Sequence, residues 1–234
     1  MKRKHSLAIT ALLLPLSGFA QEKGLNVVFI MADDLGLNDT GYTGSDYYET
    51  PNIDQLSKEG MAFTNAYSSA ANSAPSRACF MSGMYTPRHG IFTVSPPDRG
   101  DRAKRKLIAV PNTEDLRTDI MTLGELFHRN GYRCGHVGKW HLGDARKFLP
   151  LQHGFDEYYG LPYSNDMWPN HPQYKFPDLP LIEGNEVIGY NTEQSELTTN
   201  YTNRAVDFIR RSTGSGKPFF LYLAHSMPHV PLAV

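Results

Sequence analysis

Apolar and β-branched runs alternate along the chain with segments whose apolar positions recur every three or four residues. Residues 25–34 (LNVVFIMADD) form an apolar run that ends in two acids, and residues 218–225 (PFFLYLAH) form another. Continuous apolar runs of this length predict strands that are buried on both faces of a sheet. Residues 61–67 (MAFTNAY) predict a short strand, and residues 132–143 (YRCGHVGKWHLG) predict a strand that runs into a loop.

Helix signals lie between these predicted strands. Pro51 suits the first turn of a helix that Gly60 ends, and Pro75 favours a second helix that begins close to Ser73. Ser73 is therefore expected near a helix N-terminus.

Two further helices are predicted in the second half of the chain. At residues 122–131, Thr122 and Glu125 have the spacing of a capping box. At residues 192–211, apolar side chains recur at helical spacing. The order of strands and helices predicts an α/β fold: a mostly parallel sheet flanked by helices, with ligands at the carboxyl ends of the strands.

Two long stretches show neither the helical nor the strand period. Residues 95–118 are rich in charge and proline, and predict an excursion over the surface. Residues 150–191 are dominated by proline, asparagine, glycine and aromatic residues. This composition predicts a long irregular segment over the active face.

The first twenty residues have the pattern of a secretory signal. Met1–Ala20 has a basic start, an apolar centre and small residues at its end, so cleavage is expected after Ala20. The apolar centre is too short and too interrupted by Pro15 to predict a membrane span, and no later stretch reaches spanning length. We expect an exported protein, periplasmic or extracellular. The formal net charge of −1 gives no reason to expect a nucleic-acid partner.

The chain contains two cysteines, Cys79 and Cys134. A single disulfide is possible, but their wide separation in sequence says nothing about proximity. Two buried thiols are the preferred interpretation, and no Cys or His spacing indicates a zinc site.

Two pairs of residues could bind ions. Asp33 and Asp34 place two carboxylates at a strand end, where a hard divalent cation would relieve their repulsion; equally, one acid could cap a turn while the other faces water. Ser73 and Arg77 lie four residues apart at a predicted helix start, which suits an anion. The alternative for this pair is a capping serine and a surface arginine.

Lysine and histidine side chains follow two other predicted strands. Lys139 and His141 are two residues apart, so in extended backbone they project to the same side and could bind an anion and move a proton. The alternative is a surface lysine and a histidine that hydrogen-bonds a backbone carbonyl. His225 and His229 follow the strand at residues 218–225, and at least one of them is expected to be structural.

As an ordered set, these motifs resemble those of the type I sulfatases, and are most similar to the arylsulfatase A group. The resemblance runs from about Leu25 to the last residue. It rests on six stretches: NVVFIMADDLG, TPNIDQLSKEG, SAPSRACFMSG, GYRCGHVGKWHLG, LQHGFDEYYGLPYSND and PFFLYLAHSMPHVP. The resemblance implies an alkaline phosphatase-like fold.

The resemblance also implies a modified nucleophile. Ser73 occupies the position that sulfatases oxidise to formylglycine, and a serine there is similar to the version matured by radical enzymes of anaerobic bacteria. A serine-type sulfatase-maturating enzyme is therefore an expected partner. Asp33, Asp34 and the modified Ser73 would bind a calcium ion.

Four further side chains receive roles from the same resemblance. Arg77 would steady the aldehyde hydrate, Lys139 would contact the sulfate, and His141 would help to break the covalent intermediate. His229 would protonate the leaving alcohol. Ser164 would make a weaker contact with the substrate.

The chain also departs from the family pattern. Calcium usually takes six to eight oxygen ligands, and the Asp-Asn pair and second lysine of the family are not found within the 234 residues. We therefore expect residues 21–234 to be the N-terminal part of a sulfatase catalytic domain, without its remaining strands and C-terminal domain.

The predicted function is that of a sulfuric ester hydrolase acting on a sulfated sugar or an aryl sulfate. One alternative is a phosphatase or phosphonate ester hydrolase of the same superfamily, since these enzymes also attack tetrahedral anions at a metal-bound nucleophile. The other is an inactive, truncated fragment.

Overall fold

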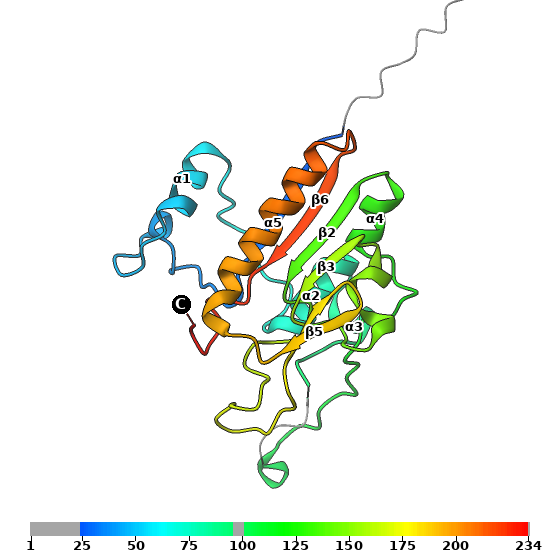
Figure 1. Ribbon diagram of the computed structural model, residues 1–234. Coiled ribbons are helices and arrows are strands. Elements are labelled where there is room, and N and C mark those ends of the chain that lie inside the picture. Colours follow the sequence, from blue (N-terminus) through cyan, green and yellow to red (C-terminus); the bar gives the residue numbers. More distant parts are fainter. Residues whose placement is uncertain (1–23, 96–100, 234) are drawn as a thin grey trace, which may run out of the picture.

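A six-stranded sheet forms the centre of the computed structural model, which describes residues 24–95 and 101–233 (Figure 1). Its strand order is β1-β6-β2-β3-β4-β5, and the neighbouring strands β1, β6, β2 and β3 run parallel whereas β4 and β5 run antiparallel. The strands are β1 (Val27–Met31), β2 (Arg133–Gly138), β3 (Glu157–Gly160), β4 (Pro180–Glu183), β5 (Glu186–Tyr190) and β6 (Phe219–Ala224). The predicted signal, Met1–Ala20, lies outside the described residues.

Helices lie on both faces of this sheet. The helices of the described chain are α1 (Pro51–Glu59), α2 (Ser73–Ser82), α3 (Thr86–His89), α4 (Leu123–Arg129) and α5 (Leu197–Thr213), of which α1 lies apart from the sheet and packs on η1. Single 3-10 turns lie at η1 (Gly41–Thr43), η2 (Arg102–Lys104), η3 (Arg146–Phe148), η4 (Pro150–His153) and η5 (Gln194–Glu196). In Figure 1, α5 crosses one face over β6 and β2, while α2 and α4 lie behind the sheet. The predicted α/β architecture is confirmed.

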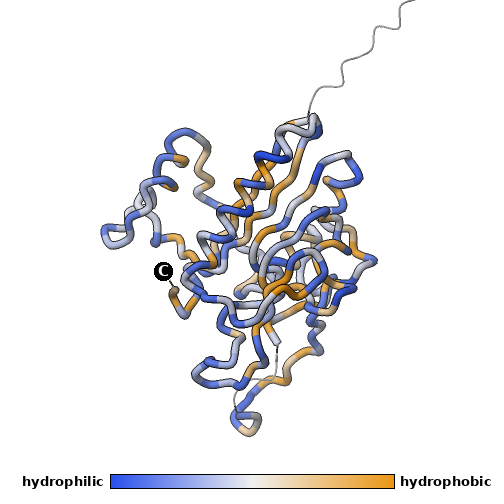
Figure 2. The backbone as a smooth tube through the Cα atoms, in the orientation of Figure 1, coloured by the Kyte–Doolittle hydropathy of each residue, from blue (hydrophilic) through white to orange (hydrophobic). Residues whose placement is uncertain are grey.

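The central strand β6 explains how the core is divided between the two faces. All six of its side chains are buried, and they alternate between two apolar clusters. Figure 2 shows the strand as a largely hydrophobic stretch of the backbone. Phe219, Leu221 and Leu223 pack against α5, whereas Phe220 and Tyr222 pack against the side of α2 and α4. A strand covered on both faces can be apolar throughout, as the sequence pattern predicted.

The helix starts agree with the sequence signals. The predicted capping box of α4 is present, because the Glu125 N–H donates to Thr122 Oγ1 at 3.2 Å and the Thr122 N–H donates to the Glu125 carboxylate at 2.9 Å. α1 begins at Pro51 and ends before Gly60, and α2 begins at Ser73. Local signals, the capping box of α4 and the prolines in the first turns of α1 and α2, thus agree with these helix starts, although α1 and α2 have no side-chain cap.

Strand β1 is not buried on both faces, so that prediction was wrong. Val27, Phe29 and Met31 pack against the core, but Val28 and Ile30 on the other face are 43% and 60% exposed. β1 is an edge strand in the described part of the chain, and α5 packs over β6 and β2 instead.

The strand predicted at residues 61–67 is absent. Its side chains Met61, Phe63 and Tyr67 are all more than 70% exposed. Strand propensity needs a neighbouring strand and a surface to pack on, and no described strand pairs with this segment.

The segment at residues 150–191 is less irregular than predicted, because it contains β3, β4 and β5. Each of these strands has only four or five residues, which is too short for alternation to be visible in sequence. Residues 161–179 between β3 and β4 do remain without helix or strand. The surface excursion at residues 95–118 is supported for its described part, where only η2 forms.

Both cysteines are buried free thiols, as preferred from the sequence. No helix among the described residues is long and apolar enough to span a bilayer.

Gly138 is a point where the backbone leaves no room for a side chain. Its φ is 111°, and a Cβ atom there would lie 1.8 Å from the Ala224 carbonyl oxygen of the neighbouring strand. We expect Gly138→Ala to lower the free energy of unfolding by more than about 3 kcal/mol, because both the backbone conformation and the strand pairing would be strained. Urea denaturation would measure this loss.

Gly189→Ala in β5 is the matched control, because a Cβ there would have nothing within 4 Å. Its effect should stay within about 1 kcal/mol. Equal losses for the two variants would contradict the assigned β2–β6 contact.

Glu157 at the start of β3 generates a pH prediction. Arg211, which donates to both carboxylate oxygens at 2.8 and 2.7 Å, and Arg133 lower the pKa of Glu157 to about 2, although partial burial opposes them. The charge of Glu157 therefore stabilises the fold above its unfolded pKa, near 4.5, and this contribution is lost as the pH falls towards about 2.

The stability difference between wild type and Glu157→Gln should accordingly shrink over that pH range. Because the group is partly exposed, the difference near neutrality should be on the order of 1 kcal/mol. Thermal melts across the range would measure it, with Glu196→Gln as the control for a change in surface charge. A difference that grew as the pH fell would contradict the assignment.

Candidate active site

The predicted site residues come together at the carboxyl edge of the parallel strands. Backbone hydrogen bonds continue past the strand ends: the Asp33 N–H donates to the Met227 carbonyl at 3.2 Å, and the Lys139 N–H donates to the Ala224 carbonyl at 2.9 Å. The loops after β1, β2 and β6 are therefore held side by side, and their polar side chains converge.

The ammonium group of Lys139 lies at the centre of the site. Its Nζ is 2.5 Å from Asp33 Oδ2, 3.0 Å from Ser73 Oγ and 3.1 Å from Ser164 Oγ. The Lys139 side chain is fully buried. Three oxygen partners match the three protons of an ammonium group, so this buried cation is completely coordinated.

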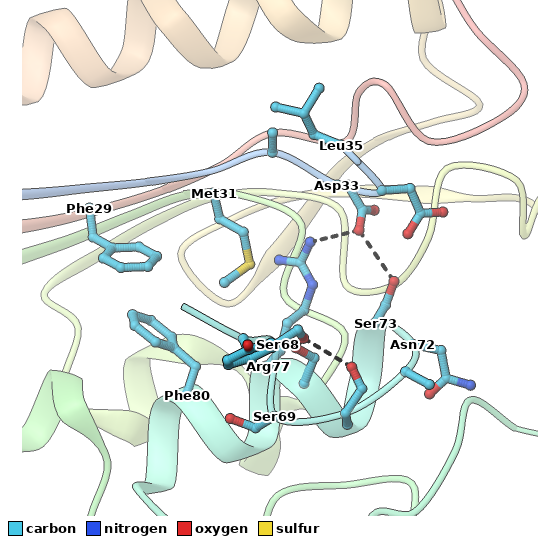
Figure 3. Close-up of a pocket in the computed structure, with 16 residues that line it drawn as sticks. Phe29, Met31, Asp33, Leu35, Ser68, Ser69, Asn72, Ser73, Arg77 and Phe80 are labelled. Atoms are coloured by element: carbon cyan, nitrogen blue, oxygen red, sulfur yellow. Dashed lines mark hydrogen bonds and ion pairs between the residues drawn. The ribbon is translucent and has the colours of Figure 1, made fainter. Parts of the chain in front are cut away.

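Arg77 is the second buried cation, and it reaches the site from α2. Its Nη2 lies 3.2 Å from Asp33 Oδ1, and its Nη1 donates to the Lys139 carbonyl at 2.9 Å and to the Tyr222 hydroxyl at 3.1 Å. Figure 3 shows Arg77 and Ser73 pointing at the same carboxylate. Nη2 is therefore engaged by Asp33, whereas Nε makes no hydrogen bond with any described residue.

Charge and burial compete at this cluster. Burial alone would raise the pKa of Asp33, but Lys139 and Arg77 outweigh it and hold the pKa below its usual value. Burial, assisted by Arg77, lowers the pKa of Lys139 to about 8. The carboxylate and the ammonium group are therefore both charged near neutral pH.

Ser73 is not the cap of its helix. Asn72 occupies the N-cap position with extended backbone, and Ser73 is the first residue of α2. Its Oγ donates to Asp33 Oδ1 at 3.3 Å and accepts from Lys139. The reading of a capping serine beside a surface arginine is therefore wrong: Ser73 faces the charged cluster, and Arg77 is 2% exposed.

His141 lies beside Lys139 in an unusual backbone conformation. Its φ is 61°, and its N–H donates to the Pro162 carbonyl at 2.9 Å. Burial, followed by the charge of Lys139, holds the pKa of His141 well below its usual value, so the imidazole is neutral. Its Nδ1 has no hydrogen-bond partner among the described residues. A neutral imidazole with an open nitrogen can accept a proton.

His229 lies across from His141 and contacts two other predicted residues. Its Nε2 is 3.5 Å from Ser164 Oγ and 3.5 Å from Asp34 Oδ2, and its Nδ1 is 2.6 Å from the Val230 carbonyl oxygen. Asp34, like His141, has a positive φ of 61°. A left-handed backbone costs a non-glycine residue on the order of 1–3 kcal/mol, and such strain collects at functional sites.

Two cavities open onto this cluster. One, of about 500 Å³, is lined by both acids of the site and by Ser73 and Arg77 (Figure 3). The other, of about 450 Å³, is lined also by His141, Ser164 and His229. Ser73 thus lines both cavities.

His225 does not join the cluster. Its N–H donates to the Met31 carbonyl at 2.9 Å, and its ring lies 6.4 Å from that of Tyr201. This packing agrees with the expectation that one histidine of the pair is structural.

Two residues near the site were missed in the sequence, Tyr222 and Asp166. Tyr222, which contacts Arg77, lies within an apolar strand and gave no signal. Asp166, which lines the second cavity, lies two residues after Ser164, and this spacing was visible in the sequence.

The comparisons with known proteins agree on one family. The sulfatase family model matches residues 25–234, which is most of the chain. The chain belongs to the sulfatase family. N-acetylgalactosamine-6-sulfatase of Mus musculus is 36% identical to this sulfatase over 234 residues, and the match covers 97% of the chain and 44% of the relative.

Two further proteins are similar to this chain over most of its length. Arylsulfatase G of Rattus norvegicus is 32% identical over 243 residues, covering 94% of the chain and 44% of the relative. The crystal structure of Ps i-CgsB in complex with k-i-k-neocarrahexaose is 33% identical with a TM-score of 0.68, covering 88% of the chain and 46% of that structure. The sulfatase therefore spans less than half the length of these relatives, and its alkaline phosphatase-like fold is confirmed.

Removing the charge of Asp33 should destabilise the sulfatase strongly. Asp33→Asn would leave two buried cations, Lys139 and Arg77, without their carboxylate partner. We expect a loss of about 3–5 kcal/mol in the free energy of unfolding, measured by urea denaturation in the presence of a chelator.

Asp34→Asn is the matched control, because the Asp34 side chain is 58% exposed. Its effect under the same conditions should be within about 0.5 kcal/mol. Comparable losses in the two variants would show that the buried ion pairs do not organise the site.

Proposed function

We propose that this site hydrolyses sulfate esters of sugars, with Ser73 as the precursor of the nucleophile. The observation that carries the proposal is the position of Ser73 Oγ. It lies between the Lys139 ammonium at 3.0 Å and the Asp33 carboxylate at 3.3 Å, at the N-terminal end of α2. The five-coordinate transition state of attack on sulfur at Ser73 would place its negatively charged oxygens near two buried cations, Lys139 and Arg77, and a helix N-terminus.

Family membership implies formylglycine at the serine or cysteine of the motif, and we assign it to Ser73. The hydrated aldehyde would supply one hydroxyl that attacks sulfur and a second through which sulfate is expelled by carbon–oxygen cleavage. Ser73 lines both cavities, so it can be reached by solvent and substrate. The modification would be made by a serine-type maturating enzyme.

The family also implies a calcium ion, and the donor set fits one. Asp33, Asp34 and Ser73 offer hard oxygen atoms around one cavity, which is the ligand type that calcium prefers. Asp33 already has two cationic partners, so an ion here would share this carboxylate with them. Bound calcium would neutralise charge that develops on the sulfuryl oxygens.

The two histidines that line the second cavity suit proton transfer. His229, 3.5 Å from Ser164 Oγ, is placed at the substrate side of Ser73, where we propose that it protonates the leaving alcohol. His141 is neutral with an open Nδ1, so we propose that it takes the proton when sulfate is released. Ser164 would contact the substrate between them.

Sulfated sugars are the proposed substrate class. The supporting relatives are named N-acetylgalactosamine-6-sulfatase and arylsulfatase G, and one similar structure contains k-i-k-neocarrahexaose. The N-terminal pattern at Met1–Ala20 further supports export, periplasmic or extracellular, where a sulfated glycan is accessible.

The maturation of Ser73 can be tested directly. The natural protein would be produced in cells that contain a serine-type maturating enzyme, and the peptide that contains Ser73 analysed by mass spectrometry. We expect the aldehyde at Ser73 and sulfate release from sulfated sugars, with aryl phosphate turned over far more slowly than aryl sulfate.

Ser73→Ala produced in the same way is the control, and should lose at least about 10³-fold in kcat/KM, because no nucleophile can form. Release of sulfate by protein whose Ser73 is entirely unmodified would contradict the proposed mechanism. Faster hydrolysis of aryl phosphate than of aryl sulfate would contradict the proposed reaction.

A further inference from the structure

We infer that the segment at residues 171–176 forms a second subsite for the substrate: its aromatic side chains hold a sugar ring beside the scissile sulfate, and Lys175 binds a further anionic group of the same saccharide. This inference rests on the proposed function. It names the substrate class more narrowly, as a saccharide that carries a second sulfate or a carboxylate.

The segment and the chemistry share one cavity. His171, Tyr174, Lys175 and Phe176 line the cavity of about 450 Å³ whose other side contains Ser73 and the site histidines. The volume is within the range of small-molecule sites, so the cavity has room for more than a sulfate group. A substrate that reaches Ser73 through this cavity would place its remaining atoms against this segment.

The aromatic wall is a packed cluster of three rings. His171 lies 5.1 Å from Tyr174 and 5.3 Å from Phe176, and the last two rings are 6.1 Å apart. Tyr174 is 48% exposed, so part of a ring remains open to a ligand. Rigid aromatic faces offer apolar area at little entropic cost, which suits the apolar face of a sugar ring.

His171 holds this wall in place. Its Nδ1 accepts hydrogen bonds from the backbone N–H groups of Gln173 and Tyr174, at 3.0 and 3.1 Å. Its Nε2 lies 3.8 Å from Asp166 Oδ2. The backbone N–H of His171 donates to the Trp168 carbonyl at 3.1 Å. A loop without helix or strand is thereby ordered by one side chain, so the subsite exists before the ligand arrives.

Lys175 is the cation in this cavity that is available to bind a second anionic group of the substrate. Of the two acids that line it, Asp34 lies near His229 and Asp166 lies near His171. Lys175 is exposed, and it makes no ion pair or hydrogen bond with any described residue. The deeper cations are committed to Asp33 and to the first sulfate, so Lys175 is the group that remains for a second anion.

Lys175→Gln tests the charge of the second anion. Two substrates would be compared: a singly sulfated monosaccharide, and the same sulfated sugar linked to a ring that carries a second sulfate or a carboxylate. We expect kcat/KM for the doubly charged substrate to fall about fivefold, through KM, and the loss to vanish at high salt. The singly charged substrate should change less than about twofold.

Lys217→Gln is the matched control for a lost surface charge, because Lys217 lies outside the cavity in the turn before β6. It should leave both substrates unchanged. If Lys175→Gln lowered kcat/KM equally for both substrates, the proposed contact with a second anion would be wrong.

Tyr174→Ala tests the aromatic wall. It should raise KM for both saccharides about tenfold, while Tyr174→Phe, which keeps the ring, should restore it. Tyr190→Ala, at an exposed tyrosine of β5 outside the cavity, is the control. Equal losses with Tyr174→Ala and Tyr174→Phe, or no loss with either, would overturn the stacking role.

Binding by Ser73→Ala protein separates this inference from the proposed reaction. Calorimetry on that background measures saccharide affinity without turnover. Tighter binding of the doubly charged saccharide that Lys175→Gln abolishes would support the subsite even if no sulfate were released. Equal affinity for both saccharides would overturn it, whatever the enzymatic result.

Discussion

The buried cluster of one carboxylate and two cations is the interaction on which the rest of the site depends. Asp33 comes from the end of β1, Lys139 from the end of β2 and Arg77 from α2. None of these charges can be buried alone, because an unpaired ion in the interior costs several kcal/mol. Three elements that are distant in sequence therefore have to meet in one arrangement, and that arrangement also positions Ser73.

This constraint links folding and chemistry. The same ammonium that neutralises Asp33 contacts Ser73 and Ser164, so a cation that the core requires also lies where we propose that the sulfate binds. Around it, Asp34 and His141 have left-handed backbone, and Arg77 Nε has no hydrogen-bond partner among the described residues. Such local costs are tolerated where the surrounding sheet over-determines the conformation.

The proposed chemistry and the proposed substrate specificity lie in two different parts of the molecule. The sheet edge, with its short loops, holds the groups that would act on the sulfate. The irregular stretch between β3 and β4, ordered by His171, forms the far wall of the cavity. Loops on a rigid scaffold commonly carry specificity, because they can vary without disturbing the core. The exposed outer face of β1 belongs to neither part, in a chain that spans less than half the length of its relatives.

The sequence by itself determined the α/β architecture, the capping of α4, the start of α2 at Ser73 and the group of polar residues at strand ends. These features depend on local chemistry: apolar runs, proline and glycine positions, and motifs with short spacing. The motif set also sufficed to indicate the family.

The sequence did not determine the exposed face of β1 or the lack of a strand at residues 61–67, since both depend on which neighbouring elements are present. Only the tertiary structure decided that Ser73 faces Lys139 and Asp33, that Tyr222 supports Arg77, and that His225 stays apart from His229. These contacts join residues far apart in sequence, and their geometry follows from the packing of the whole sheet.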